Sequence, residues 1–358
     1  MKFLVTGDWH VGNLSFGVIQ DGGKNSRLLD VANTVEKIST FAREQSVDML
    51  IHCGDVFQTN RPTTEDQLIF YRFLHQTHNI DGIDVRVIIG NHDYNSQLGK
   101  GHALKLFMQM FEGSGVKIYD KTQWEECEGY HICFYPYRGE EPDWSGRDRD
   151  KSILVCHSHL EGAVVGAEPF EIRDDKATKF KDLPVRAVFA GHFHKPQLLS
   201  KNPLVFYPGS IQPIDFNERN DIKGVVLVDT DDWRPRPAGF RTRRLVQIDL
   251  SLPCNDLSDR LSRDVSESIV KVNIESVEAD AHLFDEVEIR SILEHNGAHS
   301  IAAINLNVQR TQVKRDPDIK IDSDVRSNFT RYLKQRDLGD LADEVRQAGY
   351  AIIEESVQ

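Results

Sequence analysis

Five short blocks of metal-binding side chains constrain the fold of this 358-residue chain more than any other feature. Four of them directly follow an apolar run typical of a β-strand, so the chelating residues stand where strands end. Because the carboxyl ends of neighbouring strands meet at one edge of a sheet, we expect the blocks to lie together there. The blocks are Gly7-Asp8-Trp9-His10, Gly54-Asp55, Gly90-Asn91-His92-Asp93, Cys156-His157-Ser158-His159 and Gly191-His192-Phe193-His194.

Strand and helix patterns alternate over residues 1 to about 230 and predict a layered α/β or α+β architecture, with central sheets flanked by helices. Apolar periodicity predicts helices over residues 26–45 and from Thr63 or Thr64 to about His78. The second helix should carry an apolar face formed by Leu68, Tyr71 and Leu74. The predicted strands are 3–6, 49–53, 85–89, 131–135, 153–156, 187–190 and 225–228.

The chain is too long for one ordinary core, and its composition divides it into three parts. Asp231 to Arg244 interrupts the pattern with two prolines, a glycine and five arginines. We place a domain boundary there, so that residues 1–244 form the first domain and residues 245–312 a small β-α-β domain. Residues 313–358 then form a linker and two amphipathic helices with one apolar stripe each.

The net charge and the cysteine pattern limit the classes of protein to which the chain can belong. The formal net charge of −13 counts against binding nucleic acid by a uniform basic surface, but it allows a local basic track. Five scattered cysteines without CxxC spacing predict reduced thiols rather than disulfides or a zinc site. No run approaches the roughly 18 apolar residues of a membrane span, and the chain does not start with a signal-peptide pattern. We expect a cytoplasmic protein, associated with the nucleoid or with the cytoplasm of a phage-infected cell.

The residue types of the blocks suit phosphodiester hydrolysis. That reaction needs a nucleophile at neutral pH and relief of phosphoryl charge, and two cations roughly 3.5–4 Å apart supply both. Asp8 and His10 alternate on an extended segment and can grip one ion together, and His192 and His194 have the same spacing. Mixed His, Asp and Asn ligands suit manganese, iron, zinc or cobalt better than an all-oxygen magnesium cage. His92 is the natural candidate for a proton donor or phosphate contact.

The order of the blocks resembles the signature of calcineurin-like metallophosphoesterases: Asp-x-His, Gly-Asp, Gly-Asn-His-Asp, a lone His and Gly-His-x-His. Within that superfamily the chain looks most similar to SbcD-type nuclease subunits and their counterparts in the meiotic-recombination-eleven family. Phe206–Pro213, Asp215–Glu218 and Lys223–Val225 carry this finer resemblance. The resemblance covers residues 1 to about 230. It implies a two-sheet phosphoesterase sandwich flanked by helices, with a small α/β capping domain and C-terminal helices beyond it.

The resemblance also implies a role for each chelating residue. Seven residues would bind two divalent ions in two groups joined by a bridge: Asp8, His10 and His194; Asn91, His157 and His192; and Asp55 between them. Manganese is the expected metal, with magnesium, iron, cobalt or zinc as alternatives. His92 would match the catalytic histidine. His159 is the alternative to His157, which immediately follows the strand and keeps the family's distance to Glu161-Gly162-Ala163.

The activity that the resemblance implies is that of a DNA exonuclease and endonuclease, the nuclease subunit of an SbcCD-like recombination or repair complex. The implied partners are DNA, an SbcC-type coiled-coil ATPase that docks on the final helices, and a second copy of the chain in a homodimer, without a membrane. The candidate phosphate contacts, for which solvated charged loops are the alternative, are Arg147, Arg149, Arg241, Arg243 and Arg244.

Several alternatives stay open at this point. The same metal core suits a small-molecule phosphatase or a cyclic-nucleotide phosphodiesterase, and a non-catalytic scaffold for DNA ends and an ATPase is a third possibility. The final helices can pack on their own domain instead of docking on a partner. Trp9 either shapes the pocket beside the metal cluster or belongs to the core.

Overall fold

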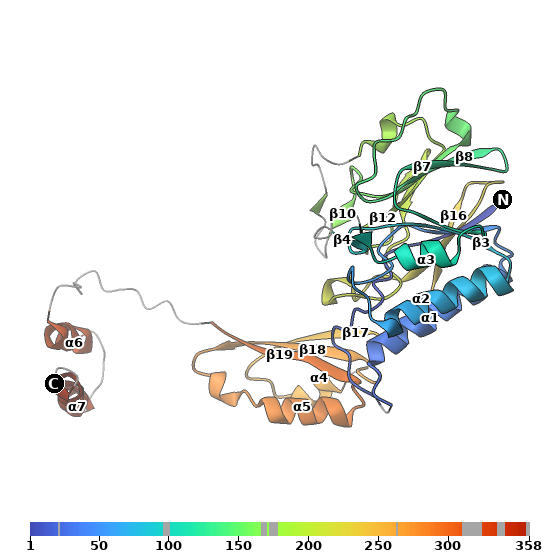
Figure 1. The fold of residues 1–358 in the computed structure, drawn as a ribbon. Coiled ribbons are helices and arrows are strands. Elements are labelled where there is room, and N and C mark those ends of the chain that lie inside the picture. Colours follow the sequence, from blue (N-terminus) through green and yellow to red (C-terminus); the bar gives the residue numbers. More distant parts are fainter. Residues whose placement is uncertain are drawn as a thin grey trace. The chain divides into compact units, whose positions relative to one another are not determined.

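The structure is a computed structural model that describes residues 1–20, 22–95, 101–165, 170–171, 178–262, 264–309, 324–334 and 341–355 (Figure 1). The chain divides into two compact units, Met1–Glu275 with Leu283–Asn307, and Ser276–His282 with Val308–Gln358. Within the described ranges, every helix is too short or too polar to cross a bilayer.

Six strands form the first sheet of the larger unit, in the order β16-β15-β1-β2-β3-β6. Four of them run parallel: β1 (Lys2–Thr6), β2 (Met49–His52), β3 (Asp84–Ile88) and β6 (Val116–Tyr119). The antiparallel strands are β15 (Gly224–Asp229) and β16 (Pro235–Gly239). The proline-rich part of the segment that the sequence marks as a break is therefore an edge strand, a sheet position that tolerates proline.

The second sheet also has six strands, in the order β13-β14-β12-β9-β8-β7. Four of them run parallel: β8 (Tyr130–Tyr135), β9 (Ser152–His157), β12 (Ala187–Gly191) and β14 (Leu204–Tyr207). Its antiparallel edges are β7 (Gln123–Cys127) and β13 (Gln197–Lys201). Two short pairs lie outside both sheets: β4 (Tyr94–Asn95) with β5 (Gly101–His102), and β10 (Val164–Val165) with β11 (Phe170–Glu171).

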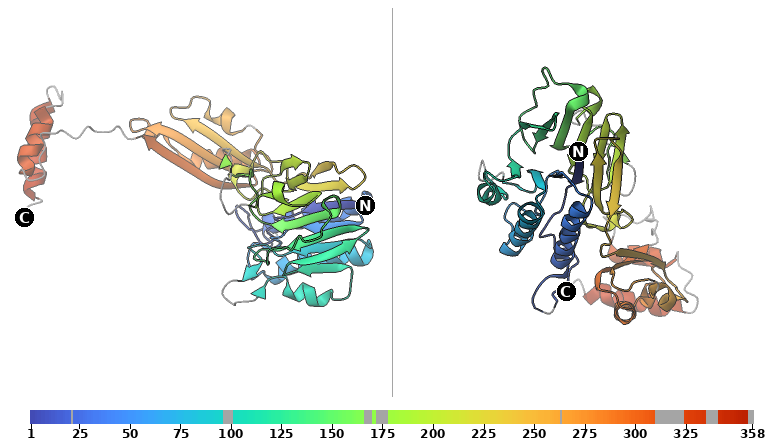
Figure 2. Two further views of the ribbon diagram at one scale, coloured as in Figure 1. Left: turned by 90° about the horizontal axis from the view of Figure 1, so that it is seen from above. Right: turned by 90° about the vertical axis from the view of Figure 1, so that its right-hand side faces the viewer.

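The two sheets pack face to face, and helices cover the outer face of the first (Figures 1 and 2). Alternate side chains of each strand divide between these layers: Leu4 faces the helices, whereas Phe3 and Val5 contact the second sheet. The covering helices are α1 (Ser26–Glu44), α2 (Thr64–Leu74) and α3 (Lys105–Met110). The predicted two-sheet phosphoesterase sandwich flanked by helices is confirmed.

The helix starts follow from side-chain caps. The Asn25 side chain accepts the Arg27 N–H before α1, and Thr63 forms a reciprocal capping box with Asp66 before α2. Beyond Leu74 the second helix continues as the π-helix η1 (His75–Ile80). The apolar face expected of this helix is partly wrong, because Leu68 is 42% exposed. It lies two residues, or about 200°, from the buried Phe70, whose stripe includes Phe73 and Leu74.

A small three-stranded sheet follows, in the order β17-β18-β19. Its strands are β17 (Leu245–Ser251), β18 (Ile269–Val277) and β19 (Ser300–Gln309), and α4 (Leu257–Leu261) and α5 (Glu286–His295) pack on it around Leu250, Val270 and Leu293. The strands and helix expected after residue 245 are present, whereas the partition at residues 244 and 312 stays a prediction. Ser300 donates to the Phe16 carbonyl at 2.8 Å and ties β19 to the loop after β1.

Two helices make up most of the described part of the smaller unit, α6 (Val325–Lys334) and α7 (Ala342–Glu355). They contact each other through Phe329 and Tyr350, whose ring centroids lie 6.1 Å apart, and Arg326 lies over the Tyr350 ring. Both helices match the sequence prediction, and the chain from residue 313, where the predicted linker begins, to residue 323 lies outside the described residues. The residues that the structure describes also contain four 3₁₀ turns: η2 (Arg149–Lys151), η3 (Phe180–Asp182), η4 (Phe216–Glu218) and η5 (Ala281–Leu283).

Candidate metal centre

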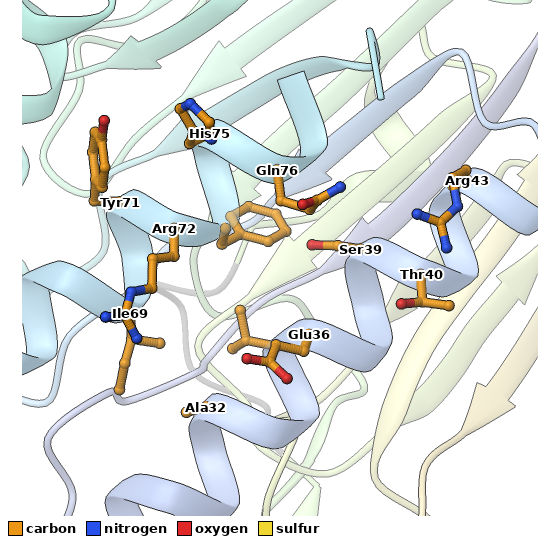
Figure 3. Close-up of a pocket in the computed structure, with 12 residues that line it drawn as sticks. Ala32, Glu36, Ser39, Thr40, Arg43, Ile69, Tyr71, Arg72, His75 and Gln76 are labelled. Carbon is orange, nitrogen blue, oxygen red and sulfur yellow. The ribbon is translucent and has the colours of Figure 1, made fainter. Parts of the chain in front are cut away.

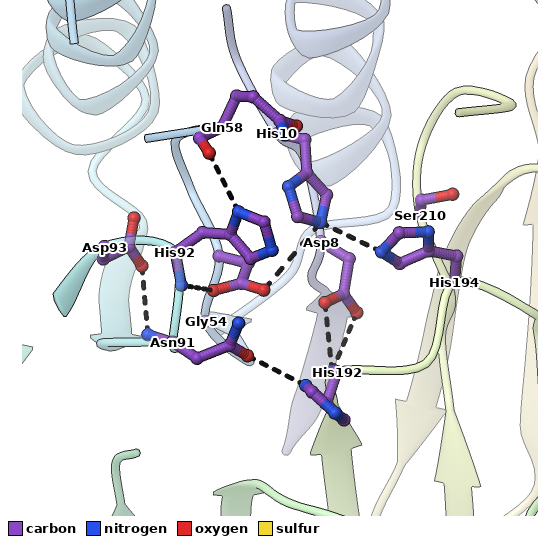
Figure 4. A network of polar contacts seen from close by, with 12 residues as sticks. Asp8, His10, Gly54, Gln58, Asn91, His92, Asp93, His192, His194 and Ser210 are labelled. Carbon is purple, nitrogen blue, oxygen red and sulfur yellow. Dashed lines mark hydrogen bonds and ion pairs between the residues drawn. The ribbon is translucent and has the colours of Figure 1, made fainter. Parts of the chain in front are cut away.

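The predicted chelating side chains converge at one edge of the sandwich (Figure 4). Asp8, Asp55 and Asn91 follow β1, β2 and β3 of the first sheet, which are parallel neighbours. His157 ends β9 and His192 follows β12 of the second sheet, which are also parallel neighbours. The carboxyl ends of both sheets therefore face a common point, as the sequence pattern predicts.

Three overlapping groups of ligand atoms lie around this point; two of them match the predicted ion sites, and the third is His10, Asp55 and His92. The first is Asp8, His10 and His194, whose ligand atoms lie within 4.8 Å of one another, with 3.0 Å between the Nε2 atoms of His10 and His194. The second is Asp55, His157 and His192, within the same limit. Because imidazole and carboxylate donors suit divalent transition metals, each group has the chemistry of one ion site.

Asp55 adjoins both groups. Its Oδ2 atom lies 3.8 Å from His10 Nε2 and 3.3 Å from His157 Nε2. Asn91 completes the second group, because its Oδ1 atom lies 3.0 Å from His157 Nε2 and 2.9 Å from His192 Nδ1. A single carboxylate between two sets of donors can bridge a pair of ions of the kind that two-metal hydrolases use.

Oxygen acceptors fix which nitrogen three of the histidines offer. The Nδ1–H groups of His157, His194 and His92 donate to Cys53 O, Glu218 Oε1 and Gln58 O, each at 2.8 Å. Since these oxygens only accept, each Nδ1 carries a proton, and Nε2 is the nitrogen left for a ligand. For His157 and His194 this is the orientation that an outer carbonyl or carboxylate imposes on a metal ligand.

The backbone at the centre is strained. Asp8, His10, Asp55 and His192 have φ values of 50°, 48°, 56° and 103°. Side chains with a Cβ rarely adopt this left-handed region, and residues held there cluster at functional sites. Four of the chelating residues are thus held in conformations that only the surrounding structure can impose.

Burial leaves the centre short of positive charge. Burial raises the pKa of Asp8 to about 6 and lowers the pKa of His10 to about 3. Burial also lowers the pKa of His157, but Asp55 outweighs it and raises that pKa to about 9. A proton on His157 is therefore the main compensation for two buried carboxylates. Divalent cations would supply that charge directly, so the residues present fit a metal pair.

The backbone segments around the centre approach one another closely. A Cβ atom at Gly191 would lie 2.0 Å from the Cys53 carbonyl oxygen, and one at Gly90 would lie 2.3 Å from the Asp55 nitrogen. Asp93 fastens the loops together, because its carboxylate accepts the N–H groups of Phe57 at 3.0 Å and Gly90 at 3.0 Å. Sequence reasoning assigned no role to Asp93, since its partners belong to two different loops.

Glu218 and Lys223 form a second support that sequence reasoning missed. Glu218 accepts the His194 Nδ1–H, and the buried Lys223 ammonium lies 2.7 Å from Glu218 Oε2 and 2.8 Å from the His194 carbonyl oxygen. The only sequence signal was that both residues belong to segments that carry the family resemblance. Their contact with a chelating histidine depends on the fold.

The remaining predicted residues divide by position. His159 is exposed, and its Nε2 atom lies 2.5 Å from His192 Nε2, outside the groups of ligand atoms. His157 belongs to one of those groups. The assignment of His157 as the ligand stays a prediction. Trp9 is 1% exposed and donates to the Thr6 hydroxyl at 2.7 Å, with its ring 4.7 Å from that of Phe73. Trp9 therefore belongs to the core.

The candidate DNA-contacting arginines have varied surroundings. Arg243 pairs with Asp30 at 2.8 Å, Arg244 pairs with Asp264, and Arg147 lies over the Trp124 ring at 4.0 Å. Among the described residues, no carboxylate forms an ion pair with Arg147, Arg149 or Arg241. These three side chains could therefore contact a phosphate without breaking an ion pair. Phosphate contact by all five arginines stays a prediction.

Two pockets differ in their relation to the centre. One of about 390 Å³ opens directly at His192, His194 and Glu218. Another of about 540 Å³ lies between α1 and α2, lined by residues such as Val35, Arg43 and Phe73, and includes none of the chelating residues (Figure 3). Of these two pockets, the first is therefore the one that adjoins the metal centre.

Comparison with known proteins identifies a family and several relatives. Residues 1–196 match the family described as calcineurin-like phosphoesterase. The chain is 26% identical over 242 residues to exonuclease subunit 1 of Enterobacteria phage T4, covering 65% of the chain and 66% of that protein. It is 23% identical to the SbcD component of the nuclease SbcCD from Bacillus subtilis, covering 64% of the chain and 66% of that protein. With the DNA double-strand break repair protein Mre11 of Thermoplasma acidophilum it shares 24% identity, over 94% of the chain and 90% of that protein. The chain thus spans just under two thirds of the first two relatives and most of the third.

Proposed function

The chain belongs to the calcineurin-like phosphoesterase family, and from this premise we propose that it is a metal-dependent DNA nuclease. The observation that carries the proposal is the position of Asp55, one carboxylate 3.8 Å from His10 Nε2 and 3.3 Å from His157 Nε2. Relatives named as an exonuclease subunit, a nuclease subunit and a DNA repair protein support DNA as the substrate.

Seven residues would hold two divalent ions, with manganese as the proposed metal. Asp8, His10 and His194 would hold one ion; Asn91, His157 and His192 would hold the other; Asp55 would bridge them. When bound, such a pair supplies a nucleophile at neutral pH and neutralises charge on the phosphoryl oxygens. Cys53 and Glu218 orient the imidazole rings of His157 and His194 for binding the two ions.

His92 is the proposed catalytic residue. Its backbone N–H donates to Asp55 Oδ1 at 2.8 Å, and its ring packs edge to face on the His10 ring with the ring centroids 4.7 Å apart. Since Gln58 O takes the Nδ1–H, Nε2 remains free to hold a proton for the leaving oxygen or to contact the phosphate. Losing such a group costs about 10²–10⁴ in rate.

The test is manganese-dependent digestion of end-labelled linear duplex DNA, with bis(p-nitrophenyl) phosphate and a cyclic nucleotide in parallel. Asp55→Ala should abolish cleavage and reduce the bound manganese, measured by elemental analysis. His92→Ala should slow cleavage about 10²-fold or more while retaining the metal. His131→Asn is the matched control, because His131 lies near the start of β8, at the opposite end of the strand from the centre. Turnover of the small esters with DNA left intact would instead favour a small-molecule phosphatase or phosphodiesterase.

The proposed assembly contains DNA, an SbcC-type ATPase and a second copy of the chain. Exposed Leu106 and Met110 on α3, at 50% and 52%, support self-association, and exposed Val345 and Ile352 on α7 support docking of the ATPase. Residues 245–312 would cap the active site and contact DNA, and residues 313–358 would carry the docking helices. Light scattering should find a dimer that Leu106→Glu dissociates, and Ile352→Glu should weaken co-elution with the ATPase. A monomer at every concentration contradicts the first claim, and unaltered co-elution contradicts the second.

A further inference from the structure

A guanidinium group held by two tyrosine rings stands apart from the metal ligands. Arg138 Cζ lies 5.3 Å from the ring centroid of Tyr94 and 5.6 Å from that of Tyr137. The two rings meet edge to face with their centroids 6.1 Å apart. Both distances from the cation fall within the range of cation–π attraction, so the rings hold the Arg138 side chain in place.

Topology brings this group to the edge that carries the metal centre. Tyr94 follows His92 by two residues. The loop after β2 contacts both residues: Gln58 O accepts the His92 Nδ1–H, and the Asn60 side chain donates to the Tyr94 carbonyl at 3.2 Å. Tyr137 and Arg138 follow the carboxyl end of β8, which pairs in parallel with β9, the strand that ends at His157. Neighbouring strands lie about 4.8 Å apart, so the two loops emerge side by side.

Nothing in the described part of the chain neutralises this cation. Arg86, Arg243 and Arg244 each form an ion pair with a carboxylate, whereas no carboxylate of the described residues pairs with Arg138. Arg138 is exposed, and its φ of 59° lies in the left-handed region that residues with a Cβ rarely adopt. An exposed, oriented and unpaired guanidinium on a strained backbone suits an anion that comes from outside the chain.

We propose that Arg138, held by Tyr94 and Tyr137, binds a backbone phosphate of the polynucleotide next to the phosphate that is cleaved. The inference rests on the proposed nuclease function, because a small phosphoester has no second phosphate to offer. Each strand of duplex DNA carries one charge per about 3.4 Å of axis, so a flanking phosphate lies within reach of a loop one strand away from His157. The planar fork of arginine matches phosphate oxygens in pairs. Arg138 thereby selects polynucleotides over simple diesters.

The experiment compares Arg138→Ala with Arg43→Ala. Arg43 is a matched control, since its side chain is 55% exposed and it lies at the end of α1, which leads into β2 at the opposite edge of the sheet. Arg138→Ala should raise KM for linear duplex DNA about tenfold and reduce the slope of log affinity against log salt by about 1. Its loss of kcat/KM on DNA should exceed its loss on bis(p-nitrophenyl) phosphate by about tenfold. Arg138→Lys should keep the salt slope and lose part of the affinity, because lysine retains the charge and loses the fork.

The outcomes separate this inference from the function on which it rests. If the wild-type chain hydrolyses the small diester and never cuts DNA, the nuclease function fails and the inference fails with it. If the wild type cuts DNA and Arg138→Ala matches Arg43→Ala in KM and salt slope, the inference alone is overturned. Thermal melting checks that the variants are folded. Should Arg138→Ala unfold, Arg138→Lys decides, since unaltered DNA affinity in that variant rejects the phosphate contact.

Discussion

Adding one methyl group at Gly191 tests whether the two sheets must approach as closely as they do at the metal centre. The new Cβ of Gly191→Ala would lie 2.0 Å from the Cys53 carbonyl oxygen and 2.9 Å from His157 Nδ1. Cβ atoms essentially never come within 3.0 Å of another heavy atom outside their own stretch of chain, so the carbonyl and the strand must separate by about 3.0 − 2.0 = 1.0 Å.

That displacement acts on His157, a proposed metal ligand. Cys53 O accepts the His157 Nδ1–H at 2.8 Å, and the bond does not survive a shift of about 1 Å. Overpacking of this kind costs about 1–3 kcal/mol of stability. Loss of an outer partner of a ligating histidine weakens metal binding by about 10–100-fold, and a 1 Å misplacement at a catalytic centre slows the reaction by about 10²-fold. We therefore expect a folded protein with weak metal affinity and little activity.

Urea unfolding, manganese titration by calorimetry and diester hydrolysis at saturating manganese together measure these three effects. Gly101→Ala is the matched control, because among the described residues its Cβ would meet only the Asn95 Cβ, at an ordinary 3.9 Å. Wild-type manganese affinity and rate in Gly191→Ala would refute the reasoning. Lost stability with unchanged metal binding would show that the sheets separate elsewhere and that the Cys53 to His157 contact does not orient the ligand.

Buried charges away from the bridging carboxylate give two further predictions. Glu218→Gln should weaken manganese binding about 10–100-fold, because His194 loses a carboxylate acceptor, and should leave the far-ultraviolet circular dichroism spectrum unchanged. Calorimetry measures the manganese affinity. An unchanged affinity would show that Glu218 only pairs with Lys223 and does not orient His194. Burial raises the pKa of Glu125, but Arg86, Tyr119 and Lys117 outweigh it and lower that pKa from 4.5 to about 2. Its folded-state pKa is depressed, so the stability that this ion pair contributes is present above pH 4.5 and is lost as the pH falls toward 2. Urea unfolding between pH 6 and pH 2 should show this loss in the wild type and a flatter curve in Glu125→Gln, and parallel curves would count against the ion pair.

The sequence could predict the centre because its information is local. Strands such as β1 and β2 are apolar on both faces, which marks buried parallel strands, and their chelating residues follow at once. Edge strands lack that signal. β7 carries Gln123, Glu125 and Glu126, and β16 contains two prolines, so each is a strand only because a neighbouring strand pairs with it.

Supporting residues could not be predicted for a related reason. Glu218 lies 24 positions after His194, and Asp93 lies 37 positions after Val56 and 36 after Phe57, and no periodic pattern connects such pairs. Their roles depend on where the ends of different strands meet. The same holds for Arg138, whose two tyrosine neighbours come from loops of different sheets. Side chains that bind a metal are recognisable by type, whereas side chains that position them are defined by contact.

The position of Asp55 joins the fold to the chemistry. His10 Nε2 belongs to the first sheet's loops and His157 Nε2 to the second sheet, and Asp55 Oδ2 is 3.8 Å from one and 3.3 Å from the other. Each proposed ion would also take ligands from both sheets, Asp8 with His194 and Asn91 with His157, so the geometry of both ion sites depends on the separation of the two sheets. That separation is in turn set by the side chains between them, among which Phe3 and Phe189 touch across the interface with ring centroids 5.9 Å apart. Because close-packed interiors transmit a change of one methylene, the apolar layer of the sandwich is part of the metal centre's geometry, even though none of its residues carries a ligand.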